Sequence, residues 1–527
     1  MDADAVVIGA GPNGLVAANH LADAGWKVVV CEEQPEPGGA VRSGEVTAPG
    51  FVHDLYSAFY PLSLASRHIA PLRLESYGLE WRTARAVLAH PHADGRCALL
   101  SMELEQTCAS LDAFAAGDGE AWRGLFELWR RAGPHLVGAM LTPLPPLRPA
   151  AGMLAALGPR GLADFARFSL LPARRLAEER FGGEGGGWLI TGNALHADLT
   201  PDSAGGGLFG WLLCCLGQLH GYPVAAGGAG AITAALVRRL EERGGEVFCE
   251  TPIERVEVHR GRARAAVGAD GRRFGARRAI LADCDAPALL LKMLPPDAVP
   301  DRVRAGLRRY HYDNSTFKVN WALRAPIPWS AAEARLASTV HVAEGIEGLT
   351  AASLQLASRE IPARPFLVLG QYSMVDSSRA PAGGEAAWAY SHVPHGPCRD
   401  AAGELAGDWA GGDAERFAER MEMEVERLAP GFRELILARD IQTPLDLERN
   451  NRNLVGGAIN GGTAQLHQQA IFRPYPGLGR PTTPVRGLYL ASSSAHPGGG
   501  LHGGPGGNAA RTALRLERAR ALLRPWA

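Results

Sequence analysis

Three glycines near the N-terminus have the spacing of a loop that holds phosphate groups. They are Gly9, Gly11 and Gly14, in the pattern G-x-G-x-x-G, with Pro12 and Asn13 inside the same turn. The first glycine permits a tight turn, the second lets a ligand approach the backbone, and the third lets the next helix pack closely. The free N–H groups at the start of that helix then face the phosphate charge. This chemistry is the binding of a nucleotide pyrophosphate.

Two acidic residues follow where a ribose is expected. Residues 5–8 and 27–31 form apolar strand patterns, with a helical pattern between them, and Glu32 and Glu33 end the second strand. A carboxylate at this place accepts hydrogen bonds from ribose hydroxyls, and its charge argues against a 2′-phosphate. The complete strand–helix–strand unit therefore predicts dinucleotide binding and disfavours NADP.

A second pair of glycines indicates that the dinucleotide is a flavin. Gly38 and Gly39 follow Glu32 by six and seven residues, an extension that many flavoproteins share. These glycines allow the backbone, including that of Ala40, to pass close to FAD. Arg42 then either reaches a phosphate group or remains a solvated surface charge.

The chain returns to this unit in later segments. Residues 224–258 read as a glycine loop, an amphipathic helix and a strand, and a further apolar strand leads into ADCDAPAL. Residues 485–523 read as a strand, a glycine-rich loop and a helix whose N-terminus points into the loop. Strands that alternate with helices predict an α/β fold with a Rossmann-like domain assembled from discontinuous segments.

These motifs resemble those of the phytoene desaturase-like flavoproteins. The matching segments are GAGPNGLVAANHL, GGAVRSGE, GFVHDLYSAFYPL, FKVNWAL and GLYLASSSAHPGGGLHGGPGGNAAR. The group includes carotenoid desaturases, retinol saturase and the pyridine nucleotide-disulfide oxidoreductase domain protein 2 type, to which the likeness is closest. The resemblance spans most of the chain and is weakest at about residues 110–220. It implies a FAD-binding domain of residues 1–95, 222–290 and 480–527, and an inserted α+β substrate domain of residues 96–221 and 291–479.

The same resemblance implies a set of residues that bind FAD. The glycine turn holds the pyrophosphate, Glu32 the adenosine ribose, and Ile253 the adenine through its backbone. The Leu501–His502 backbone lies near the pyrimidine edge of the flavin. We expect the FAD to be noncovalent, because no cysteine follows Cys398 to anchor it. The expected cofactor-binding residues are Gly9, Gly11, Pro12, Asn13, Gly14, Glu32, Glu33, Gly38, Gly39, Ala40, Arg42, Ile253, Ser492, Gly499, Gly500, Leu501 and His502.

Two positions depart from the pattern of the family. An acid often stands within the motifs that here read Val455–Ile459 and Phe317–Trp321, where this chain has Ala458 and Asn320. Any chemistry that depends on those acids is absent here or is carried out by other groups.

Four residues are candidate catalytic groups. Lys318 is one of three lysines in a chain with 51 arginines, and strand alternation places it on one face with Asn320. Burial can make a lysine neutral, whereas an arginine stays charged; the alternative is a surface or ion-paired lysine. His502 could exchange a proton near pH 7 or stabilise its loop. Tyr60 could line the pocket or pack, and Asp54 could move protons or fix a loop.

Composition excludes other classes of function. The 54 basic and 55 acidic residues give a net charge of −1, which excludes a strongly basic nucleic-acid binder. None of the eight cysteines has CxxC spacing, so neither a zinc site nor a redox dithiol is predicted, and we expect no metal. No signal peptide is evident, which favours the cytoplasm. Residues 203–237 lack charged side chains and predict either a buried helix or a peripheral membrane contact.

The expected function is oxidoreductase chemistry. No second G-x-G-x-x-G follows a strand, so an organic substrate, rather than NAD(P)H, is expected to reduce the flavin. The leading hypothesis is desaturation of a hydrophobic small molecule, with oxygen or a quinone reoxidising the flavin. Amine or amino-acid oxidation, isomerisation and saturation are alternatives on the same fold, and a non-catalytic escort protein is a remote one. The oligomeric state stays open.

Overall fold

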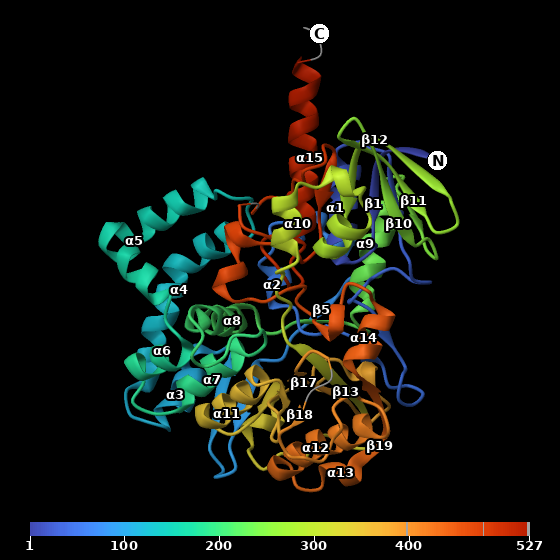
Figure 1. Ribbon diagram of the computed structural model, residues 1–527. Helices are drawn as coiled ribbons and strands as arrows, with labels where there is room; N and C mark the ends of the chain where they lie inside the picture. The colour runs from blue at the N-terminus through green and yellow to red at the C-terminus, as the bar shows by residue number, and fades with distance from the viewer. Residues whose placement is uncertain (397–398, 478, 524–527) are drawn as a thin grey trace.

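Two sheets and a lobe of helices make up the molecule. In Figure 1 the first sheet and the long helix α15 lie at the top, the second sheet lies at the bottom, and the helical lobe lies at the left. The computed structural model describes residues 1–396, 399–477 and 479–523. Cys398 therefore lies outside the described residues.

The first sheet has the parallel centre that the strand–helix–strand pattern predicts. Its central strands are short runs rich in Val, Ile, Leu and Ala that are mostly buried on both faces, as is usual where helices cover a parallel sheet. The neighbours β20, β12, β1, β2 and β9 pair in parallel, and β12 continues into an antiparallel arm with β11 and β10. The strands are β1 (Asp2–Ile8), β2 (Val28–Cys31), β9 (Glu246–Phe248), β10 (Ile253–His259), β11 (Arg262–Gly268), β12 (Arg273–Ala282) and β20 (Leu488–Leu490).

Three helices cover this sheet and join the two ends of the chain. They are α1 (Pro12–Asp23), α9 (Gly230–Glu242) and α15 (Gly504–Leu523). The apolar side chains of α1 form one core with those of α9, α15, β1 and β2. The C-terminal glycine loop therefore lies against the N-terminal glycine turn, as the repeated returns of the chain predict.

The second sheet is antiparallel apart from one parallel pair, β14 with β6. Its strands follow the order β19, β13, β17, β16, β14, β6 and β7, so neighbours in space are seldom neighbours in sequence. The strands are β6 (Ala86–Pro91), β7 (Cys97–Ser101), β13 (Ser315–Leu323), β14 (Ala337–Val342), β16 (Leu367–Gln371), β17 (Glu385–Val393) and β19 (Ile436–Gln442).

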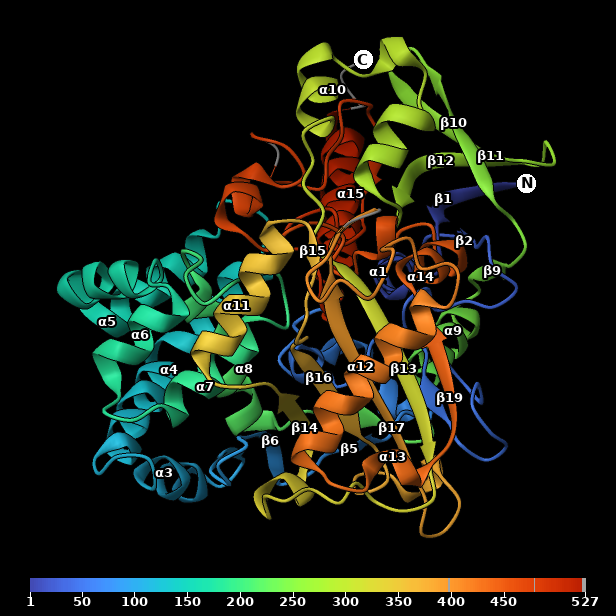
Figure 2. The same cartoon turned by 60° about the horizontal axis from the view of Figure 1, so that its bottom comes forward.

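Alternation along β13 gives the second sheet two different faces. Phe317, Val319 and Trp321 pack in an apolar core with α12 (Asp413–Leu428), which lies across the strands in Figure 2. Lys318 therefore points to the opposite face, because successive side chains of a strand alternate. That face is turned toward the helical lobe and the first sheet.

The helical lobe has its own core of large apolar side chains, among them Trp122, Trp129 and Trp211. Helix α8 packs beside α7 and reaches the second sheet at β6 and β7. The helices are α3 (Leu104–Asp112), α4 (Asp118–Met140), α5 (Leu147–Phe168), α6 (Ala173–Arg180), α7 (Gly185–Ala194) and α8 (Gly206–His220).

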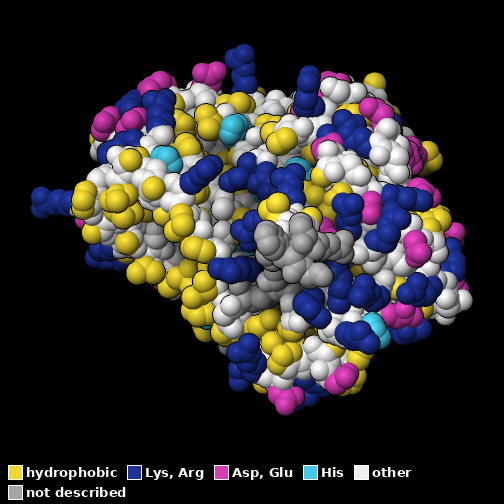
Figure 3. Space-filling model, turned by 90° about the horizontal axis from the view of Figure 1, so that it is seen from above, with side chains coloured by type: hydrophobic (Ala, Val, Ile, Leu, Met, Phe, Trp, Pro, Cys, Tyr) yellow, Lys and Arg dark blue, Asp and Glu magenta, His cyan; other side chains and the backbone are white. Residues whose placement is uncertain are grey.

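Residues 203–237 are mostly interior. Most of α8 is buried, including Cys214 and Cys215, which favours the buried-helix alternative. Exposed apolar side chains lie on α5 instead, where Leu147 is 72% exposed and Leu154 44%; Figure 3 shows apolar side chains gathered on the side of the molecule where α5 lies. Within the described residues, no helix is long and apolar enough to cross a membrane.

Residues 86–91 lie in the second sheet, although they fall within the segment 1–95 that we expected in the FAD-binding domain. Strand β6 pairs with β7 and β14 there. This pairing favours a boundary before Ala86. The remaining short elements are β3 (Ser43–Gly44), β4 (His53–Asp54), β5 (Trp81–Arg82), β8 (Val224–Ala225), β15 (Glu360–Ile361), β18 (Arg399–Asp400), α2 (Pro61–Leu64), α10 (Asp301–Leu307), α11 (Ile346–Ala357), α13 (Phe432–Leu435) and α14 (Pro444–Asn450).

Candidate active site

A cavity of about 980 Å³ is lined by residues of both sheets and of the helical lobe. We call the part next to the carboxyl ends of β1, β2 and β12 the cofactor half. We call the part between the second sheet and helices α4 and α8 the substrate half. Most of the expected cofactor-binding residues line the cofactor half: Gly9, Gly11, Pro12, Asn13, Glu32, Glu33, Gly39, Ala40, Ile253, Gly499, Gly500, Leu501 and His502.

Four of the expected residues do not line the cavity: Gly14, Gly38, Arg42 and Ser492. Arg42 is hydrogen-bonded within the protein. Its guanidinium group donates to the Gly39 carbonyl oxygen at 3.2 Å and to the Tyr56 hydroxyl at 2.7 Å. Arg42 therefore braces the second glycine pair.

The glycine turn leaves an open groove because side chains are missing at two facing positions. A Cβ on Gly39 would lie 3.0 Å from the Cα of Gly11, so these two backbones face each other closely. Gly9 has a φ of +91° and Gly39 a φ of +54°, in the left-handed region that favours glycine. Side chains at these positions would fill the groove.

Glu32 is held in place by the turn that it faces. Its carboxylate accepts hydrogen bonds from the backbone N–H groups of Ala10, at 2.7 Å, and Gln34, at 2.9 Å. Burial raises the pKa of this carboxyl group, and the two N–H groups oppose that rise. Each carboxylate oxygen keeps a second lone pair, which suits it to accept from ribose hydroxyls.

Asp283 is a buried acid that the sequence analysis did not select. It follows β12, and its Oδ2 accepts a hydrogen bond from the Gly14 N–H at 2.8 Å. A Cβ on Gly11 would lie 2.6 Å from the same oxygen, so the carboxyl group sits directly under the glycine turn. Burial raises the pKa of Asp283 to about 7, with the Glu32 charge adding to the rise. A strand that ends in an acid beside β1 is the signal that could have identified it.

His502 holds the C-terminal loop together. Its Nδ1 accepts a hydrogen bond from the Gly504 N–H at 3.0 Å, and its Nε2 lies 3.1 Å from the Gly499 carbonyl oxygen. Both ring nitrogens are thus engaged, and burial lowers the pKa of the imidazole to about 4. These contacts favour the loop-stabilising alternative, so we do not retain His502 as a proton-transfer group.

The cofactor half fits a ligand that is rich in hydrogen-bonding groups. Three buried polar atoms beside it have no partner: Asn13 Oδ1, Ser492 Oγ and Asn460 Nδ2. Together with the open glycine groove and the ribose-facing acid, they match the pyrophosphate, ribose and ring edges of FAD.

The substrate half combines an apolar wall with a polar floor. The wall comes from α4 and α8, with Leu136, Met140, Leu208, Phe209, Leu212 and Leu213. The floor is the face of the second sheet that turns away from α12, with Thr316, Lys318, Thr339, Val368, Trp388 and Tyr390. Tyr60 lines the cavity near the boundary between the two halves.

Lys318 lies in the cavity wall, as strand alternation predicts. Its side chain is 2% exposed and donates to the carbonyl oxygens of Asp54 and, at 3.4 Å, of Tyr56. Burial lowers the pKa of the Lys318 ammonium group to about 8. No carboxylate accepts a hydrogen bond from it among the described residues, so a neutral form is accessible.

Asp54 joins loops instead of moving protons. Its carboxylate pairs with Arg379, at 3.1 Å to each of two guanidinium nitrogens, and accepts from Ser43 Oγ and the Ala229 N–H, each at 2.7 Å. The pKa of Asp54 is lowered because these donors outweigh the effect of its burial. This arrangement matches the loop-fixing alternative for Asp54.

Tyr60 is also committed to a local contact. Its hydroxyl group donates to the Ser57 carbonyl oxygen at 2.7 Å. Burial raises the pKa of the phenol, which keeps it protonated. We therefore assign Tyr60 to packing at the cavity wall.

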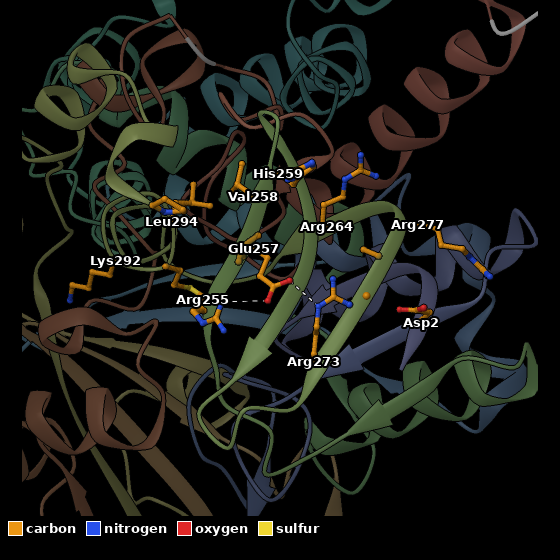
Figure 4. Close-up of a pocket in the computed structure, with 15 residues that line it drawn as sticks. Asp2, Arg255, Glu257, Val258, His259, Arg264, Arg273, Arg277, Lys292 and Leu294 are labelled. Carbon is orange, nitrogen blue, oxygen red and sulfur yellow. Dashed lines mark hydrogen bonds and ion pairs between the residues drawn. The ribbon is translucent and has the colours of Figure 1, made fainter.

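A second groove, of about 940 Å³, lies on the antiparallel arm of the first sheet and has no such organisation. Figure 4 shows Arg255 and Arg273 pointing toward Glu257, which pairs with both. Arg277 pairs with Asp4. The groove is basic, but its charges are exposed and partly neutralised, as on an ordinary solvated surface.

Comparison with known proteins fits the geometry of the cofactor half. The sequence model of the family described as "FAD dependent oxidoreductase" matches residues 4–339. This chain belongs to that family. FAD is accordingly the cofactor of this flavoprotein, and redox chemistry is its class of reaction.

Curated relatives share the full length of the flavoprotein. It is 28% identical to mouse "Pyridine nucleotide-disulfide oxidoreductase domain-containing protein 2", over 97% of this chain and 93% of the relative. It is 24% identical to "Phytoene desaturase (neurosporene-forming)" of Cereibacter sphaeroides, over 95% of this chain and 92% of the relative. These matches confirm the resemblance to the phytoene desaturase-like group.

Solved structures confirm the fold. An oxidoreductase from Methanosarcina mazei superposes with a TM-score of 0.63 at 15% identity, covering 98% of this flavoprotein and 100% of that chain. Putrescine oxidase bound to putrescine superposes with a TM-score of 0.60 at 15% identity, covering 98% and 99%. At this level of identity the likeness concerns the fold alone.

Proposed function

We propose that this flavoprotein dehydrogenates a hydrophobic organic molecule, introducing a double bond. The observation that carries the proposal is the apolar wall of the substrate half, where side chains of α4 and α8 face the cavity. Such a wall excludes water and binds a substrate by burial of apolar surface. The phytoene desaturases among the relatives are named for reactions of this type.

Bound FAD and Lys318 have separate roles in this reaction. Bound FAD supplies a two-electron acceptor, so that one substrate hydrogen leaves with its electron pair. A second hydrogen leaves the neighbouring carbon as a proton, and Lys318 in its neutral form is the group that takes it. Desolvation lowers the pKa of Lys318 to about 8, which makes a proton acceptor available near neutral pH. Oxygen or a quinone then accepts the electrons.

Other reactions on the same fold remain the alternatives to this proposal. Isomerisation and saturation would use the same apolar wall. Amine oxidation fits less well, because Lys318 is protonated below its pKa of about 8 and then places an ammonium group in the substrate half. Like charges repel in a medium of low dielectric constant, so a protonated amine would be disfavoured there.

A peripheral membrane contact is also part of the proposal, as the source of a hydrophobic substrate. The exposed leucines of α5, Leu147 and Leu154, are the surface that suits such a contact. The buried segment 203–237 is not.

The test is an anaerobic survey of substrates with the purified holoprotein. Isoprenoid hydrocarbons, fatty aldehydes and primary amines are added separately, and flavin reduction is followed by absorbance while products are analysed by mass spectrometry. The proposal predicts that an apolar compound bleaches the flavin and yields a product lighter by two hydrogens. Bleaching by amines alone, with aldehyde and hydrogen peroxide formed in air, would establish the oxidase alternative instead.

A further inference from the structure

The floor of the substrate half contains buried hydrogen-bond donors that have no partner. Thr339 is 1% exposed and Trp388 is 4% exposed, and both line the cavity. Neither the Thr339 hydroxyl group nor the Trp388 indole N–H has a hydrogen-bond partner. A buried polar group without a partner costs free energy, so its presence calls for an explanation such as a bound ligand.

The register of the second sheet places these two donors on either side of Gly370, in line across three strands. Gly370 of β16 pairs with Trp388 of β17 on one side and with Thr339 of β14 on the other. Because Gly370 has no side chain, the Trp388 indole lies over it; a Cβ there would be 2.4 Å from Nε1. The indole N–H is thereby carried across the middle strand toward Thr339, over a separation of about two strand spacings.

Lys318 lies beside these two donors. Its Nζ lies 5.5 Å from the centre of the Trp388 ring and donates to two backbone carbonyl oxygens. The neutral amine of Lys318 has no further N–H group to offer a substrate. An indole N–H only donates, and a threonine hydroxyl group can donate. Trp388 and Thr339 are therefore the donors of the floor that are left to bind an acceptor.

Two histidines of the substrate half are neutral. His196 lines the cavity and shares a hydrogen bond of 2.8 Å with His341. Burial lowers the pKa of His196 to about 3, and it lowers the pKa of His341 far below its usual value. These imidazoles therefore add no charge beside the Thr339 and Trp388 donors.

We propose that the substrate is amphipathic: it carries a hydrogen-bond-accepting oxygen group, a carbonyl or carboxylate, which is bound by Thr339 and Trp388. Its apolar body lies against the wall of α4 and α8. The inference rests on the proposed function, since it takes the apolar cavity as the substrate site. A pure hydrocarbon could not accept hydrogen bonds from these donors. An enzyme specific for a hydrocarbon would therefore bear the free-energy cost of burying them with no gain in binding.

Binding of matched eight-carbon probes to the holoprotein tests the inference. The probes are octanoate, 2-octanone, octylamine and 1-octene, and binding is followed by flavin difference spectra and calorimetry. We expect octanoate and 2-octanone to bind at least about tenfold more tightly than 1-octene and octylamine, from two or more added hydrogen bonds.

Two substitutions locate the effect. Thr339→Val keeps the shape of the side chain and removes its hydroxyl group, and Trp388→Phe removes the indole N–H. Each is expected to weaken binding of the oxygenated probes about three- to tenfold, with 1-octene unchanged. Thr191→Val is the matched control: Thr191 lies in α7, is fully buried, has an unpartnered hydroxyl group and does not line the cavity.

The outcomes distinguish this inference from the proposed function. If 1-octene binds as tightly as 2-octanone, or if Thr339→Val and Trp388→Phe leave the ratio of affinities unchanged, the oxygen-group inference is wrong and the apolar cavity stands. If octylamine is the tightest ligand, the inference is wrong and amine oxidation gains support. If no probe binds, the cavity is not the substrate site, and both proposals fall.

Discussion

The two halves of the cavity are built from different materials. In the cofactor half, backbone does most of the binding: glycines leave a groove, and the positions of Gly11 and Gly39 matter because they lack side chains. In the substrate half, side chains from separate strands supply the chemistry, with Lys318, Trp388 and Thr339 on β13, β17 and β14. Adding a side chain to a glycine should therefore impair the cofactor half. Removing a single side-chain group should impair the substrate half.

The largest effect is expected when a side chain is added to a glycine of the cofactor half. Gly11→Val places carbon within 2.6 Å of Asp283 Oδ2, so the glycine turn that forms the pyrophosphate groove must shift. We expect the purified variant to contain less than about a tenth of the flavin of the wild type, measured by absorbance.

Gly124→Ala is the control for that substitution. Gly124 lies in α4, and a Cβ there would meet nothing within 4 Å. This variant should keep its flavin. Normal flavin content in Gly11→Val would show that the groove is not where the pyrophosphate binds.

The next largest effect is expected from the buried ion pair of Asp54 and Arg379, which holds several loops together. Arg379→Met leaves the buried Asp54 carboxylate without its ion-pair partner, between the hairpin of β3 and β4 and the loop before α9. An uncompensated buried charge lowers the free energy of unfolding by about 3–5 kcal/mol. Urea denaturation followed by flavin fluorescence measures the loss, and we expect flavin release to coincide with unfolding.

An exposed ion pair gives the contrast. Arg123 pairs with Glu105 and Glu120 on the surface of the helical lobe. Arg123→Met should leave the denaturation midpoint almost unchanged, because exposed pairs are screened by solvent. An equal loss of unfolding free energy in both variants would contradict the stabilising role of the Asp54–Arg379 ion pair.

Removal of the Lys318 amino group should impair the reaction in the substrate half without releasing FAD from the cofactor half. Lys318→Met is expected to lower kcat about 10²- to 10³-fold while flavin content stays normal. Since the pKa of Lys318 is lowered to about 8 and its neutral form accepts the proton, kcat of the wild type should rise with pH and level off above about 8.

Lys318→Arg sharpens this test. An arginine keeps the positive charge but does not become neutral, so it should not restore turnover. Turnover of Lys318→Met equal to that of the wild type would remove Lys318 from the reaction.

The smallest effect is a dependence on pH in the cofactor half. Folding raises the pKa of Asp283 to about 7, so the native state disfavours its ionised form; this cost is absent below about pH 4 and complete above about pH 7. Asp283→Asn removes the charge and can still accept from the Gly14 N–H. We expect the variant to bind FAD about three- to tenfold more tightly than the wild type at pH 8 and equally well at pH 5. Equal affinities at both pH values would show that Asp283 stays neutral beside the phosphate groups.

The contrast between the halves also explains what the sequence could predict. The glycine turn, Glu32 and the C-terminal loop are local patterns, and their strand–helix context lies within about thirty residues. Strand alternation along β13 likewise predicted which face Lys318 shares with Asn320, although it left open whether that face borders a cavity. Asp283 could have been identified by the same logic, because β12 ends beside β1.

Hydrogen-bond partners, two of them sets of near neighbours and one distant in sequence, decided what residue type alone could not. His502, Tyr60 and Asp54 were selected for their chemical type, but Gly499 and Gly504, Ser57, and Arg379 satisfy them. The polar floor has no signal in the sequence, because the register of non-consecutive strands brings Trp388 beside Thr339. Such a site becomes visible only once the sheet is assembled.

The most direct test of the whole account is the anaerobic visible spectrum of the purified flavoprotein, before and after addition of NADH or NADPH. We assign FAD to the dinucleotide-binding turn and the reductant to the substrate half. We therefore expect a flavin band at roughly 450 nm. This band should persist after either nucleotide is added, and an organic substrate should bleach it. Rapid bleaching by a nicotinamide nucleotide would contradict this assignment, because the electrons would then come from a ligand that the substrate half is not built to bind.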